Sequence, residues 1–156
     1  MLKPKLTAEL VPKTAWYSNV RSNVTRAEWD VIRKEVYAQA GYVCEVCGGK
    51  GKKHPVECHE VWEYDDTTHI QKLVKMTALC SACHSVKHLG RARIVGIYHM
   101  AITHLMKING WSRTQANEYA TKVFDEYNER SKHKWKLDIR ALNKYNMVKT
   151  GEDETW

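Results

Sequence analysis

Two Cys-x-x-Cys pairs constrain the fold of this chain more than any other feature of its sequence. The first pair is Cys44 with Cys47, the second is Cys80 with Cys83, and 32 residues separate them. Each pair forms a short turn that directs both sulfur atoms toward one point. Zn²⁺ in structural sites is bound tetrahedrally by four such thiolates. The sequence therefore predicts one structural zinc ion held by these four cysteines.

The sequence leaves two other uses of the cysteines open. Two disulfides would suit an oxidising compartment, but the chain shows no secretory signal and a fifth cysteine is left over, which favours a reducing one. A thioredoxin-like redox centre needs only one Cys-x-x-Cys motif, whereas this chain has two. We therefore expect zinc rather than disulfides, and a cytoplasmic location.

Three histidines near the cysteine pairs form a second candidate metal site. His59 lies in the apolar segment 56–62, which predicts a strand. His84 and His88 follow the second pair and are four residues apart, so they share one face of a helix. A neutral imidazole accepts a proton or binds a metal ion near pH 7. His59 is thus a candidate general base, and His84 and His88 are candidate ligands of a Lewis-acidic cation.

This stretch resembles the HNH endonucleases, also called ββα-metal or His-Me finger nucleases. Zinc-containing members combine a Cys-x-x-Cys turn, a strand with the first histidine, and a final helix that reads Leu-Cys-x-x-Cys-His, as residues 79–84 do here. The resemblance covers about a third of the chain, residues 44–88. It implies an α+β fold: a ββα treble-clef core with one structural Zn²⁺, flanked by α-helices.

The resemblance also implies a function and a set of site residues. The function would be metal-dependent hydrolysis of DNA phosphodiester bonds, with double-stranded DNA as the expected partner. His59 would be the general base. His84 and His88 would bind a catalytic Mg²⁺ or Mn²⁺, or Zn²⁺, with Glu60 as a candidate third ligand.

Two positions depart from the family pattern. Cys58 stands where an Asp or His usually binds the metal, so Glu60 or Glu57 would have to supply the carboxylate. Lys75 stands in place of the middle asparagine. The candidates to replace that asparagine are Gln71, Asp65 and Asp66. A non-catalytic zinc protein that binds DNA or RNA as a regulator is therefore the alternative, although a pure binder has no need of both His59 and His84.

The charge of the chain favours a polyanionic partner. Its 25 Lys and Arg against 18 Asp and Glu give a formal net charge of +7, while residues 151–156 carry three acids and no base. Such an excess favours nucleic acid, and solubility alone is the other explanation. No apolar run reaches the length of a membrane span, so we expect no membrane partner. The basic residues that we expect to contact nucleic acid are Lys50, Lys52, Lys53, Arg91, Arg93, Lys134 and Lys136.

We expect a single domain over residues 1–156. Its predicted parts are an N-terminal arm (1–24), a helix (25–41), the zinc and ββα core (42–90), a helical part (91–130), and a basic segment with an acidic tail (131–156). Within the core we predict strands at 56–64 and 71–76 and a helix at 81–90.

Local signals place the remaining helices. Thr25 with Glu28 and Ser112 with Gln115 form capping-box patterns at two predicted helix starts. Arg91 and Arg93 should open a further helix that ends at 109–110, and the alternation at 135–139 predicts a short strand. The histidines of the helical part, His99 and His104, are interpreted as core or surface residues rather than metal ligands.

Overall fold

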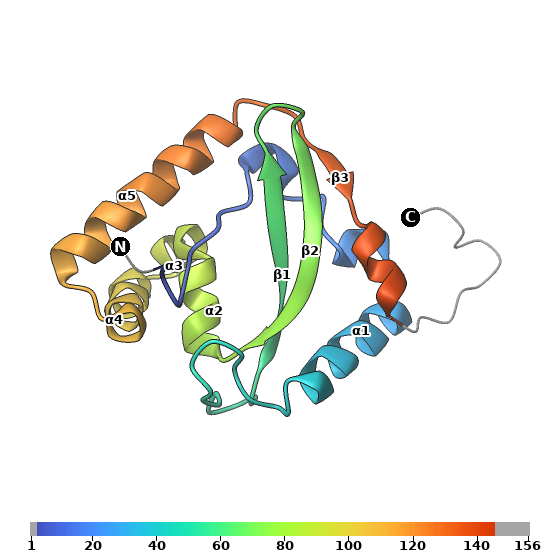
Figure 1. Ribbon diagram of the computed structural model, residues 1–156, viewed down its shortest axis with the longest axis horizontal. Coiled ribbons are helices and arrows are strands. Elements are labelled where there is room, and N and C mark those ends of the chain that lie inside the picture. The colour runs from blue at the N-terminus through green and yellow to red at the C-terminus, as the bar shows by residue number, and fades with distance from the viewer. Residues whose placement is uncertain (1–2, 146–156) are drawn as a thin grey trace.

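An antiparallel hairpin lies at the centre of the structure, with helices on both sides of it (Figure 1). The computed structural model describes residues 3–145, and this part has the mixed α+β fold that the sequence predicted. The hairpin strands are β1 (Glu57–Asp65) and β2 (Ile70–Leu79). A short third strand, β3 (Lys136–Asp138), pairs in parallel with the start of β2, so the sheet order is β1-β2-β3.

The hairpin closes in a polar turn. The Asp65 carboxylate accepts hydrogen bonds from the backbone N–H groups of Thr67 and Thr68, at 2.9 and 3.0 Å, and His69 adopts the left-handed conformation with φ of 56°. The first strand lies one residue beyond the predicted 56–64. The second extends three residues beyond the predicted 71–76, because pairing with β1 continues up to Leu79. The closed end of the hairpin therefore lies far along the strands from the cysteines.

The two predicted capping boxes are present. Helix α1 (Arg26–Gln39) starts at the Thr25–Glu28 box and buries Ile32 and Val36 against the hairpin. Helix α5 (Arg113–Arg130) starts at the Ser112–Gln115 box. Between the hairpin and α5 in the chain lie α2 (Ser81–Lys87), α3 (Leu89–Ile94) and α4 (Tyr98–Asn109). Helices α2 to α5 lie on one side of the hairpin and α1 on the other (Figure 1). No helix within residues 3–145 combines the length and apolar character that crossing a bilayer requires.

The predicted helix over 81–90 is wrong at its C-terminal end. His88 leaves the helical conformation, with φ of −115° and ψ of 56°, and it separates α2 from α3. Arg91 and Arg93 consequently belong to the short α3 and do not open the long helix. Gly96, with φ of 82°, then turns the chain before α4 begins at Tyr98.

The predicted N-terminal arm is irregular, and it belongs to the hydrophobic core. It contains two 3₁₀ turns, η1 (Lys13–Ala15) and η2 (Arg21–Asn23). Leu6 and Val20 are fully buried. The Asn109 side chain accepts a hydrogen bond from the Leu6 N–H and donates one to the Leu6 carbonyl, both at 2.8 Å. The arm is therefore fixed to the end of α4.

The C-terminal segment also packs on the sheet. After β3, a 3₁₀ helix η3 (Arg140–Lys144) places Leu142 and Tyr145 in the core. The predicted strand at 135–139 is therefore present over its middle three residues. The acidic tail, residues 151–156, lies outside the described residues.

Replacing Leu6 with alanine should test whether the arm is part of the core. Removing a fully buried leucine typically destabilises a protein by about 2–5 kcal/mol, since both burial and packing are lost. We therefore expect Leu6→Ala to lower the free energy of unfolding by about 2–5 kcal/mol in chemical denaturation. Ile94→Ala, at a residue that is 84% exposed, is the control and should stay within about 0.5 kcal/mol. Equal stabilities of the two variants would contradict a packed arm.

Candidate metal centres

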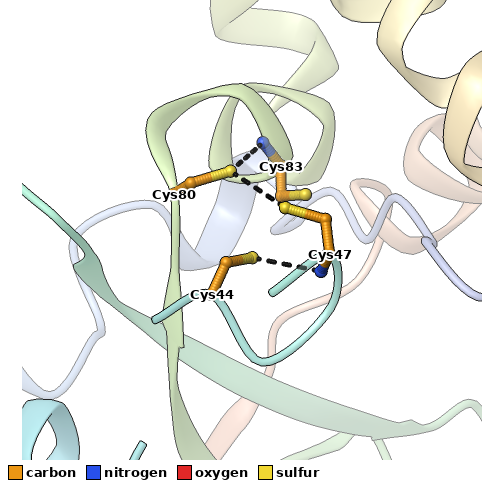
Figure 2. A group of neighbouring side chains, drawn as sticks. All are labelled: Cys44, Cys47, Cys80 and Cys83. Atoms are coloured by element: carbon orange, nitrogen blue, oxygen red, sulfur yellow. Dashed lines mark hydrogen bonds between the residues drawn. The ribbon is translucent and has the colours of Figure 1, made fainter. Parts of the chain in front are cut away.

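The four predicted zinc cysteines lie together at the open end of the hairpin (Figure 2). Their sulfur atoms are all within 4.8 Å of one another. Cys47 Sγ and Cys80 Sγ are 3.7 Å apart. Two ligands of a tetrahedral zinc ion with Zn–S bonds of about 2.3 Å lie about 3.8 Å apart, whereas a disulfide requires about 2.05 Å. The cysteines are free thiols in this geometry, and the group fits one Zn²⁺.

Backbone turns set the positions of these sulfur atoms. Cys44 Sγ accepts a hydrogen bond from Cys47 N–H at 3.5 Å, and Cys80 Sγ accepts one from Cys83 N–H at 3.4 Å. The loop that carries the first pair is joined to β2, because Glu45 N–H donates to the Ala78 carbonyl at 2.9 Å. Burial raises the pKa of Cys44, but backbone N–H donors outweigh it and bring the pKa to about 7. Such N–H donors favour the thiolate form that zinc requires.

His104 from α4 is a neighbour of this centre that the sequence analysis did not identify. Its Nε2 lies 3.1 Å from Cys83 Sγ. Burial, and then Lys107, lower the pKa of His104, and the neutral ring could donate its single N–H to Cys83 once that sulfur binds a metal ion. Sulfur–imidazole hydrogen bonds of this kind orient and stabilise a metal-bound cysteine. No spacing signal could have revealed it, because the contact depends on how α4 packs against α2.

The first prediction for the cysteine centre concerns zinc content. We expect one zinc ion per chain in the purified protein, measured by elemental analysis. Cys83→Ser should lose the zinc and the folded core, because zinc sites of this kind contribute about 10 kcal/mol of folding free energy. Cys58→Ala is the matched control, since Cys58 is outside the four-cysteine group, and it should keep the zinc. A folded, zinc-free Cys83→Ser protein would refute the assignment.

The second prediction concerns His104. His104→Ala should remain folded at saturating zinc but bind it about 10- to 100-fold more weakly, measured by competition with a chromophoric chelator, because the Cys83 thiolate loses its donor. His99→Ala replaces an exposed histidine of the same helix and should leave zinc affinity unchanged. Identical affinities in the two variants would show that the His104 contact is incidental.

The structure brings together the three histidines that the sequence proposed as the second site. One nitrogen from each of His59, His84 and His88 lies within 4.8 Å of the others. The Nε2 atoms of His84 and His88 are 3.1 Å apart. This separation matches the roughly 3.0–3.4 Å between two nitrogen ligands with metal bonds of about 2.0–2.1 Å. His59 Nε2 is buried without a hydrogen-bond partner, which leaves it free for a metal ion or a metal-bound group.

Different elements supply these three side chains. His59 is in β1, opposite Thr77 of β2. His84 lies in α2, and His88 is the residue directly after the end of this helix, so the two rings lie one helical turn apart. Glu57 accepts a hydrogen bond from His84 Nδ1 at 2.9 Å, which directs His84 Nε2 toward the other histidines. The sequence analysis considered Glu57 only as a metal ligand, and its contact with His84 gives it a supporting position.

Burial keeps two of the histidines uncharged. It lowers the pKa of His59 to about 2 and that of His88 to about 4, with smaller contributions from neighbouring histidines. Both rings are therefore neutral at pH 7, which is the form that binds a metal ion. The three histidines line a cavity of about 200 Å³ together with Cys58, Glu60 and Arg21.

The other residues proposed for this site lie around it or away from it. Both Glu60 carboxylate oxygens face donors, Val20 N–H at 2.9 Å and Trp62 Nε1–H at 3.3 Å, and Glu60 is not in the group of three. Burial raises the pKa of Cys58 to about 12, so it is a protonated thiol. Lys75 is exposed on β2.

None of the three residues considered for the missing asparagine joins the histidines. Asp65 and Asp66 are in the hairpin turn, where Asp66 binds Arg130 at 2.9 Å. Gln71 is buried near the same end of the sheet, opposite Tyr64.

The proposed nucleic-acid contacts fall into three places. Lys50, Lys52 and Lys53 are exposed in the cysteine loop, at the open end of the hairpin. Lys134 and Lys136 are exposed beside the closed end. Arg91 is exposed near the histidines, whereas the Arg93 guanidinium covers the rings of Phe124 and Tyr98, at 4.1 and 4.9 Å.

Comparisons of the chain with protein-family models, with curated proteins and with solved structures found no match. The functional argument therefore depends on the geometry of the two centres.

Proposed function

We propose that the protein is a metal-dependent endonuclease that hydrolyses DNA phosphodiester bonds at the three-histidine centre. The observation that carries this proposal is the convergence of His59, His84 and His88 on one point, with a buried nitrogen of His59 left without a partner. A purely structural role for the cluster does not account for three imidazoles that face one another, two of them held neutral by burial. The cysteine centre would be the structural zinc site of the same unit.

Each residue of the centre would have a separate role. His84 and His88 would hold a Mg²⁺, Mn²⁺ or Zn²⁺ ion, and Glu57 keeps the His84 ring in the required orientation. When bound, that ion supplies Lewis-acid stabilisation of the phosphate and the departing oxygen. His59, whose Nε2 has no other hydrogen-bond partner, would accept the proton of the attacking water.

Positive charge around the centre supports a phosphate-bearing substrate. Arg21 lines the cavity of the histidines, and Arg91 is exposed beside His88. The whole chain carries +7. Arginine binds phosphate oxygens through paired N–H donors, and a net positive surface concentrates polyanions.

Nicking of a supercoiled plasmid tests the proposal. With Mg²⁺ or Mn²⁺ the wild-type protein should convert supercoiled DNA to nicked or linear forms. His59→Ala should cut about 10²- to 10⁴-fold more slowly because it lacks the base. His84→Ala should also fail, yet recover in part at high Mn²⁺, since its defect is weaker metal binding.

Mn²⁺ affinity of the same preparations assigns the role of His59. If His59 is the base, its removal should leave the Mn²⁺ affinity unchanged. If His59 is a third metal ligand, its removal should lower the Mn²⁺ affinity. His99→Ala is the exposed-histidine control and should cut like the wild type. Undiminished cleavage by folded His59→Ala would refute the mechanism. DNA binding without any cleavage would instead support a non-catalytic regulator.

A further inference from the structure

A second cavity lies directly beside the three-histidine centre. It has a volume of about 470 Å³, and we call it the side cavity. It shares His88, Glu60 and Trp62 with the smaller cavity of the histidines. Its other walls come from the N-terminal arm, α3 and α5, in the region where the arm runs between α5 and the hairpin (Figure 1). A group bound there would be adjacent to anything bound at the histidines.

Aromatic rings line the side cavity. Trp16 and Tyr127 form a nearly parallel pair, with an angle of 18° between the rings and 6.5 Å between their centroids. The Trp16 ring is held in place because its Nε1–H donates to the Val11 carbonyl at 3.0 Å. It is nevertheless 48% exposed. A fixed, solvent-accessible indole is a stacking surface for a planar ring, and Phe124 and Trp62 add apolar area nearby.

A buried polar atom without a partner lies in the wall of the same cavity. Gln71 is 1% exposed and lines the side cavity. Its Nε2 donates to Tyr64 Oη at 3.4 Å, but its Oε1 has no hydrogen-bond partner. An unpaired buried amide oxygen is destabilising, so a ligand with an N–H donor would recover that free energy. The site therefore favours a planar ring that carries hydrogen-bond donors at its edge.

We propose that the side cavity binds one unstacked nucleobase of the substrate strand, next to the phosphate held at the histidines. Every nucleobase combines a flat π-face with N–H donors at its edge, as the Trp16 surface and Gln71 require. Arg91 is exposed at the cavity, and its positive charge complements the negative phosphates of the nucleic-acid strand next to the bound base. A cavity of about 470 Å³ is also within the usual range for small-ligand sites of roughly 300–1,000 Å³.

This inference deepens the proposed function and rests on it. A base stacked inside a duplex cannot enter a cavity in the protein, so it must be extruded or already single-stranded. The enzyme should therefore act where a nucleotide is unpaired, or where it can be unpaired at low cost. This distinguishes it from a nuclease that contacts only the backbone of an intact duplex.

Binding of short fluorescent oligonucleotides, with no divalent metal added, tests the proposal independently of cleavage. One probe is a single strand of mixed sequence. The other has the same length and phosphates but carries tetrahydrofuran abasic residues throughout. Both engage the basic surface, and only the first can fill the side cavity. The base-containing probe should bind about 5- to 150-fold more tightly, which is the stacking contribution of one base converted to affinity.

Variants assign the difference to the cavity. Trp16→Ala should weaken binding of the base-containing probe about tenfold and leave the abasic probe unchanged. Trp16→Phe should retain most of the difference because a ring remains. Tyr17→Ala is the matched control, since Tyr17 is the adjacent aromatic residue, is 89% exposed and does not line the cavity.

The outcomes separate this inference from the proposed function. Equal affinity for the two probes, or an equal loss for both in Trp16→Ala, would overturn the base-binding cavity while plasmid nicking could still establish the nuclease. Failure of both probes to bind at low salt would overturn the two proposals together. A tenfold preference for the base-containing probe that Trp16→Ala removes would support the cavity even if no cleavage were found.

Discussion

The convergence of four cysteine sulfur atoms is the constraint on which the rest of this structure depends. It joins the loop after α1 to the junction of β2 and α2, two places that are more than 30 residues apart in the chain. A metal ion bound there would stabilise this core, which includes an irregular N-terminal arm, because metal binding contributes directly to the folding free energy. His104 extends the link to α4 through its contact with Cys83.

The position of the histidines follows from that link. Cys80 is the N-cap of α2, so the second cysteine pair also sets where the helix begins and which way it runs. His84 lies one turn and His88 two turns beyond Cys80, and the rings of both lie next to His59 of β1. The side cavity lies on the other side of His88, between the arm, α3 and α5. The cysteine centre thus orients a neighbouring site that is built from one buried and two half-buried imidazoles.

Local patterns in the sequence were sufficient for some of these features and not for others. The cysteine pairs, the two capping boxes and the spacing of His84 and His88 could be predicted because each depends on neighbours within a few residues. The break at His88 could not, because the nearest stop signal in the sequence is Gly90, which lies inside α3 and not at the break. Burial of Leu6 and the contact of His104 depend on distant elements packing together, which no periodicity within one segment encodes. The HNH-like function stays a prediction from the sequence that the geometry of the histidines supports.

Anomalous diffraction from crystals soaked in Mn²⁺ would test the central claim most directly, namely that the zinc-linked hairpin and α2 create a second metal centre. The account predicts a zinc signal among the four cysteine sulfur atoms and a separate manganese signal bounded by the imidazoles of His59, His84 and His88. A manganese signal that is absent from those imidazoles, in crystals whose cysteine centre is filled with zinc, would contradict it.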